Sequence, residues 1–158
     1  MPKETFFNLP EEKRQNIYNI AIDEFSNKPY EKVSISQIVS RAKIAKGSFY
    51  QYFEDKEDLY TYLIDIIGQE KIKFMEKDFD KIEDMDFFEF MRLLYRNGVK
   101  FAAAEPNLTK IATGFMVNIP KDLKNKIISR NTTSAVDLFN AFIQKAMDKN
   151  ELRDDIDV

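Results

Sequence analysis

The chain has 158 residues, of which 44% are hydrophobic and 13% aromatic, enough to bury the core of one or two small domains. It contains no cysteine and no histidine, which argues against a disulfide framework, a thiolate metal site and the commonest general base. The first residues lack the pattern of a signal peptide, and no apolar segment approaches the ~20 residues of a membrane span. We therefore expect a cytoplasmic protein with no cofactor, no metal and no membrane partner.

Apolar residues follow helical spacing along the whole chain, with no alternating strand pattern, which predicts an all-α fold. The first helix is expected over about residues 10–27. Asn8 is a candidate cap, and Pro10 suits the first turn. The buried face of this helix is expected to hold Ile17, Ile20, Ala21 and Phe25.

Two short helices joined by a tight turn are expected next. The first begins at Ser34, an acceptable N-cap, and the second spans about residues 46–52. Phe49 and Phe53 lie four residues apart and should face inward. The outward face of the second helix is then expected to hold Lys46, Gly47, Ser48, Tyr50, Gln51 and Tyr52.

The window from residue 32 to residue 53 is basic and free of acidic residues. It contains Lys32, Arg41, Lys43 and Lys46 but no Asp or Glu, in a chain whose net charge is −3. Such segregation of charge is what a docking face requires. A phosphate backbone is the partner that best explains it, so we expect the chain to bind double-stranded DNA.

The outward residues of the second short helix suit readout of DNA. Gly47 has no side chain, which permits a close approach to the major-groove floor. Lys46 can donate to guanine or to phosphate, and Ser48 can reach a base edge. Tyr50 can contact a thymine methyl group, while Gln51 can pair with adenine.

Two further side chains are expected to bind backbone phosphates and so to fix the register of the protein on DNA. Tyr52 lies at the end of the second short helix. Lys56 lies near the start of the helix that follows, where backbone N–H groups favour a phosphate.

These residues also resemble a known family. The runs Ser34–Val39, Lys46–Phe53 and Lys56–Leu59 resemble the DNA-binding domain of the TetR family of bacterial repressors, and the resemblance covers roughly residues 10–62. It implies that Ser34 and Ser36 are additional DNA contacts.

The chain departs from the family pattern at two positions. The family usually has Gly in the turn and Ser or Thr as the cap of the recognition helix, where this chain has Lys43 and Ala45. A lysine at positive φ would be strained, and the missing cap would cost ~1 kcal/mol. Lys43 is in turn expected to add a phosphate contact.

The remaining residues predict further helices over about 55–79, 86–104 and 107–118, and one long helix or two abutting ones over 121–149. In the last of these, Val136, Phe139, Ile143 and Met147 are expected to face inward. The expected architecture is a three-helix DNA-binding head (1–54), joined by a long helix to a helical effector and dimerisation domain (55–158). Residues 150–157 resemble the loop that precedes the last helices of the family, so the chain is either truncated or dimerises differently.

The resemblance implies an effector cavity in the second domain. We expect some of its apolar residues to line that cavity: Phe87, Phe90, Met91, Leu94, Phe115, Met116 and Phe139. Tyr95, Arg92 and Arg96 are candidate polar contacts. For any single phenylalanine, however, a packed core is the commoner role.

The expected function is a ligand-responsive transcriptional regulator that acts as a repressor. It would bind a palindromic operator as a homodimer and be released by a small apolar effector. Two alternatives stay open at this point: a helical protein-interaction module without DNA specificity, and an all-helical enzyme.

Overall fold

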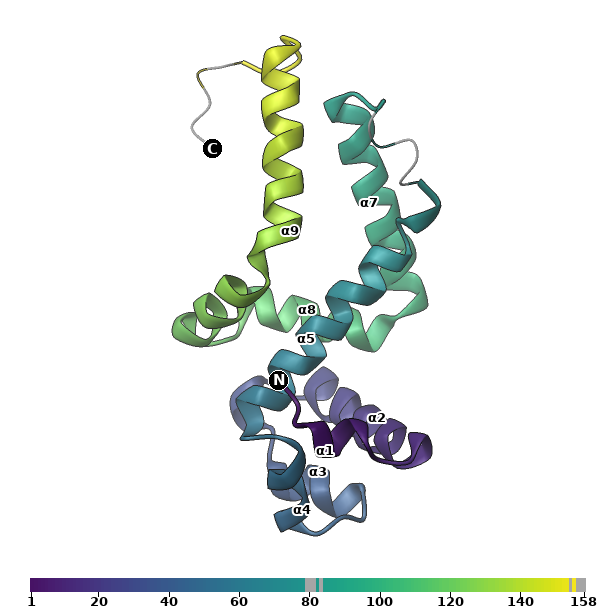
Figure 1. The fold of residues 1–158 in the computed structure, drawn as a ribbon, viewed down its shortest axis with the longest axis vertical. Helices are drawn as coiled ribbons and strands as arrows, with labels where there is room; N and C mark the ends of the chain where they lie inside the picture. The colour runs from purple at the N-terminus through teal and green to yellow at the C-terminus, as the bar shows by residue number, and fades with distance from the viewer. Residues whose placement is uncertain (79–81, 83, 154, 156–158) are drawn as a thin grey trace.

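The structure is a computed structural model of the chain. It describes residues 1–78, 82, 84–153 and 155, and for residues 131–138 it describes the backbone but not the side chains. Every regular element of the described residues is helical, which confirms the expected fold class. Figure 1 shows a small N-terminal head joined through α5 to α7, α8 and α9, with α8 lying across the top of the head.

The head consists of α1 (Glu4–Phe7), α2 (Glu11–Asn27), the short 3-10 helix η1 (Tyr30–Lys32), α3 (Ile35–Arg41) and α4 (Lys46–Tyr52). The start of α2 differs slightly from expectation, because Pro10 occupies the N-cap and Asn8 ends α1. Ile17, Ala21 and Phe25 are buried on α2, as expected. The sequence did not predict helix α1.

The rest of the chain forms α5 (Lys56–Lys73), η2 (Glu76–Asp78), α7 (Phe87–Ala104), α8 (Pro106–Val117) and α9 (Lys121–Asp148). The helix expected to reach residue 79 therefore ends earlier, and residue 79 itself lies outside the described residues. The side chain of Val136 also lies outside them, whereas Phe139, Ile143 and Met147 are half-buried. Among the described residues, no helix is both long and apolar enough to cross a membrane.

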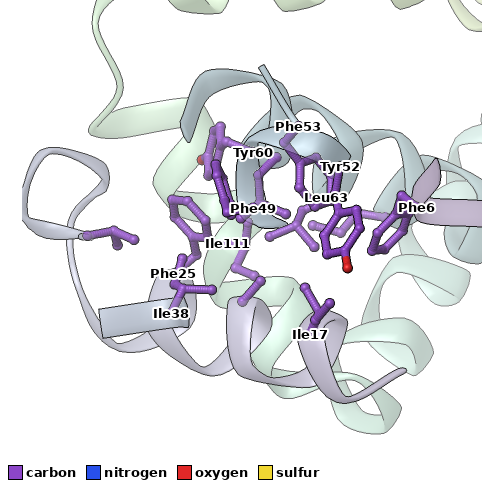
Figure 2. Packing of buried hydrophobic residues seen from close by; sticks show 14 of the residues in the cluster. Phe6, Ile17, Phe25, Ile38, Phe49, Tyr52, Phe53, Tyr60, Leu63 and Ile111 are labelled. Atoms are coloured by element: carbon purple, nitrogen blue, oxygen red, sulfur yellow. The ribbon is translucent and has the colours of Figure 1, made fainter. Parts of the chain in front are cut away.

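Aromatic side chains form the core of the head (Figure 2). Phe6, Phe49 and Phe53 are fully buried, and the ring centroids of Phe6 and Phe53 lie 4.8 Å apart. Burial of each such ring contributes about 1.5–3 kcal/mol, so this cluster holds α1 and α4 against α5.

The same core continues beyond the head. Phe101 of α7, Leu108 and Ile111 of α8, and Ile127 of α9 belong to one buried cluster with the head residues. A second cluster lies at the far end of α7 and α9, where the rings of Phe90 and Phe142 stack. The expected division at residue 54 stays a prediction, and a continuous core crosses it.

Candidate nucleic-acid interface

Helix α4 exposes polar and aromatic side chains on one face and packs its opposite face into the core of the head. Phe49 is fully buried and packs on Phe53, with ring centroids 5.4 Å apart. Lys46, Gly47 and Gln51 are exposed. Tyr50 is 43% exposed and Ser48 is half-buried, so the structure brings the five expected base-reading residues onto one short helix.

The turn before α4 is closed by a Schellman arrangement, in which the last carbonyls of α3 accept bonds from the turn. The N–H of Ile44 donates to the carbonyl of Val39 at 3.0 Å, and the N–H of Lys43 donates to that of Ser40 at 3.2 Å. Lys43 has a φ of 54°, in the left-handed region that usually takes glycine. The expected strain at Lys43 is therefore present.

The start of α4 has no side-chain cap. Ala45 occupies the N-cap position and no side chain accepts a hydrogen bond there, as expected. The N–H of Ser48 donates to the carbonyl of Ala45 at 3.0 Å, whereas the N–H groups of Lys46 and Gly47 have no side-chain cap.

Gly47 has free space beside it. A Cβ built at this position would meet no atom within 4 Å, so packing within the chain does not require glycine here. Glycine in a helix also costs roughly 0.5–1 kcal/mol of stability relative to alanine. Packing within the chain therefore does not explain the glycine, and the expected close approach to DNA stays a prediction.

The N-terminal segment caps the other end of α4. The Lys3 Nζ donates to the carbonyl of Tyr50 at 2.8 Å, and the Lys3 N–H donates to that of Tyr52 at 2.8 Å. The hydroxyl of Thr5 donates to the carbonyl of Gln51. These bonds satisfy carbonyls that a helix end leaves without partners. Sequence reasoning missed this role, and only the adjacent pair Phe6-Phe7 hinted that the segment is anchored.

Charges around α4 are divided between paired and free groups. The guanidinium of Arg41 lies 2.7 Å from carboxylate oxygens of both Asp23 and Glu24. It therefore links α2 to α3, and its charge in the basic window is balanced by these two carboxylates. Lys43 and Lys46 are exposed and form no ion pair among the described residues.

Glu24 is a buried carboxylate held by two cations. Its oxygens lie 2.6 Å from the Lys28 Nζ and 2.7 Å from Arg41. Burial alone would raise the pKa of Glu24, but the hydrogen bonds from Lys28 and Arg41 outweigh it and hold the pKa below its ordinary value.

Two residues expected to bind phosphate have different surroundings. Tyr52 is only 6% exposed and packs beside Phe6, so the expectation that it faces outward is wrong. The Nζ of Lys56 donates to the carbonyls of Tyr30 at 2.8 Å and Val33 at 3.2 Å, and lies over the Tyr30 ring. It is thus occupied by the chain itself.

The two serines expected at the start of α3 lie where the sequence places them. Ser34 is the N-cap of α3 and is half-buried, although its side chain accepts no capping hydrogen bond. Ser36 is exposed. Their expected contact with DNA stays a prediction.

Residues 17–63 match the family described as bacterial regulatory proteins, tetR family. A TetR family transcriptional regulator from Chloroflexus aurantiacus J-10-FL is 36% identical, with a TM-score of 0.69 over 99% of this chain and 71% of that one. This chain belongs to the TetR family. Because TetR-family members are transcriptional regulators, the helical-enzyme alternative is dropped.

Two other proteins define how far the TetR-family similarity extends. The uncharacterised HTH-type transcriptional regulator YdgC of Bacillus subtilis (strain 168) is 28% identical over 109 residues, which cover 68% of this chain and 55% of YdgC. The chain thus spans little more than half of that relative. The structure of the regulator FadR from Bacillus subtilis, in complex with stearoyl-CoA, has a TM-score of 0.68 at 19% identity. It covers 90% of this chain and 75% of FadR, and shows a shared fold.

The apolar residues expected to line an effector cavity are not gathered around one space. Met91 is 38%, Tyr95 78% and Met116 61% exposed, so these three lie on the outer surface and their expected role is wrong. Phe90 is 2% exposed and stacks on Phe142 at 3.9 Å between ring centroids, which is the packed-core role.

The other expected lining residues are half-buried: Phe87, Leu94, Phe115 and Phe139. Leu94 and Phe139 pack against the second cluster, whereas Phe115 packs against the first. Arg92 and Arg96 are exposed. Leu94, Phe115 and Phe139 are thus divided between two separate clusters.

One buried polar residue of α7 was missed. Asn97 is 3% exposed, and neither its side-chain oxygen nor its nitrogen has a hydrogen-bond partner among the described residues. It lies between Leu93 of the second cluster and Phe101 of the first. A buried amide without partners is costly, which makes this position a candidate for ligand recognition.

Proposed function

We propose that this chain represses transcription by binding a palindromic operator as a homodimer, and that a small effector releases it. The observation that carries the DNA-binding part is the exposed face of α4, where Lys46, Gly47, Tyr50 and Gln51 stand without a neighbouring carboxylate on the same helix. That face combines a cation, a gap for close approach and base-reading polar groups.

Selection from random double-stranded DNA with the intact chain tests this proposal. We expect enrichment of an inverted repeat whose half-sites lie about one helical turn apart. Lys46→Ala should weaken binding to the selected sequence, whereas Lys100→Ala, which removes the same charge from an exposed position on α7, should not. A protein-interaction module would enrich no sequence, and that result would reject the regulator.

Asn97 supports the effector part of the proposal. Its unpartnered amide lies between two apolar clusters, so a ligand placed there would be mainly apolar and would carry one hydrogen-bonding group. FadR, which shares the fold, was solved with stearoyl-CoA, a ligand that has a long apolar chain. We therefore propose an amphipathic effector rather than a wholly apolar one.

A thermal-shift series with medium-chain alcohols tests this site. The alcohols should raise the melting temperature of the wild-type chain, and Asn97→Leu should abolish that shift. Asn107→Leu, at an exposed position on α8, serves as the control and should keep it. An unchanged shift in Asn97→Leu would show that the amide does not contact the ligand.

The outer face of α7 supports the homodimer. Phe88 is 54%, Tyr95 78% and Val99 53% exposed, and their spacing places them on one stripe of the helix. We propose that a second copy covers this stripe, because contiguous exposed apolar surface usually marks an interface. In sedimentation at micromolar concentration, Tyr95→Glu should shift the chain to monomer while Lys100→Glu should not. A monomeric wild-type chain would reject this interface.

A further inference from the structure

A cleft of about 400 Å³ lies where the head meets α8. The end of α2 and η1 form its head side, and α5 and α8 form its other side. Its lining includes Phe25, Tyr30, Tyr60, Thr109, Lys110 and Gly114. This volume falls within the range of small-molecule sites. The cleft is separate from the exposed face of α4 and from Asn97.

One wall of the cleft is aromatic. The ring of Tyr60 lies 5.0 Å from that of Phe25 and 5.0 Å from that of Tyr30, measured between centroids. Figure 2 shows Phe25 and Tyr60 close to Ile111 of α8. Such a wall offers ring edges and faces against which a planar apolar group can pack.

One polar group of the cleft is a buried donor without a partner. The Thr109 Oγ1 forms no hydrogen bond among the described residues, whereas the hydroxyl of Thr113 donates to the carbonyl of Thr109 at 2.9 Å. Tyr60 is only 3% exposed. Burial raises the pKa of Tyr60 and raises that of Tyr30 to about 12, so both hydroxyls keep their protons at neutral pH.

The charged side chains that line the cleft are Lys28 and Lys110, and no aspartate or glutamate is among its lining residues. The Lys28 Nζ is engaged 2.6 Å from Glu24, but Lys110 forms no ion pair within the described part of the chain. An anionic group in the cleft would therefore meet the unpaired ammonium of Lys110 and the unpartnered hydroxyl of Thr109.

We propose that this cleft binds a small aromatic carboxylate. The ring would pack on the wall formed by Phe25 and Tyr60, and the carboxylate would accept hydrogen bonds from the hydroxyl of Thr109 and the ammonium of Lys110. A ligand held there touches α2 and α8 at once. Because the ligand contacts both elements, its affinity depends on the position of the head relative to α8. Ligand binding is therefore thermodynamically linked to the binding of a partner by the head.

An NMR titration of the free chain with benzoate tests the site, and because no DNA is present it does not depend on the proposed regulatory function. We expect saturable shifts of the amides of Thr109, Lys110 and Gly114. The cation benzylamine has the same ring and should produce no saturable shift at these amides. Equal binding of benzylamine would overturn the assignment of an anion.

A cleft-filling variant makes the test specific. Gly114 lines the cleft, and a Cβ there meets no atom within 4 Å, so Gly114→Leu can fold while occupying the space. It should weaken benzoate binding at least tenfold. Gly98→Leu, the same change at an exposed position on α7, should bind like the wild type. Unchanged affinity in Gly114→Leu, or absence of saturable shifts in the wild type, would overturn the site.

Discussion

Lys43 is the residue at which the helix-turn-helix is under backbone strain. Its φ of 54° is a conformation that costs a non-glycine residue roughly 1–2 kcal/mol. Lys43→Gly should therefore raise the free energy of unfolding by about 1 kcal/mol in urea denaturation. Lys46→Gly removes the same charge from the first turn of α4 and should lower it instead. A loss of stability in both variants would contradict the strain.

This strain and the missing cap at Ala45 could be predicted because both depend on local sequence. The turn position and the N-cap follow directly from where α3 ends and α4 begins. The surroundings of Lys56 could not be predicted in this way. Its partners are the carbonyls of Tyr30 and Val33, more than 20 positions away, and no sequence pattern specifies such a bond.

At the scale of elements, a buried ion cluster joins α2 to α3. Glu24 is held by Lys28 and Arg41, and its pKa is lowered from an ordinary value of 4.5. A lowered pKa means that the charged form is stabilised by folding. The contribution is complete above about pH 4.5 and is lost as the pH falls through the lower, folded-state pKa.

Comparison of the wild type with Glu24→Gln across pH measures this contribution. The wild type should be the more stable chain at pH 7, and its advantage should shrink steadily as the pH falls below 4.5. Taking the difference between the two chains cancels the titration of other carboxylates. An advantage that is constant from pH 7 to pH 3 would show that Glu24 is not stabilised by these cations.

The orientation of α7 shows a limit of sequence patterns at this scale. Apolar side chains occur on both sides of the helix: Phe90 and Leu93 are buried, whereas Met91 and Tyr95 are exposed. Periodicity alone therefore could not select the inner face. The buried face also contains Asn97, which a hydrophobic pattern passes over.

At the scale of the whole molecule, one apolar core joins the head to α8. Ile111 is 1% exposed and belongs to the same cluster as the head residues. Ile111→Ala should lower the free energy of unfolding by about 2–5 kcal/mol. As the chain unfolds, the amide NMR signals of the head and those of α8 should disappear in one transition. Ile72→Ala, at a half-exposed position on α5, is the matched control and should have little effect. Separate transitions would contradict a shared core.

Titration of the selected operator with two glycine variants tests whether the exposed face of α4 approaches DNA closely. Gly47→Ala and Gly98→Ala each replace a glycine that has open space around it, so both should keep or slightly raise stability. Only Gly47→Ala should weaken operator binding, by tenfold or more, because its methyl group would stand between α4 and the groove. Equal operator affinity in the two variants would show that α4 does not approach the groove closely at Gly47.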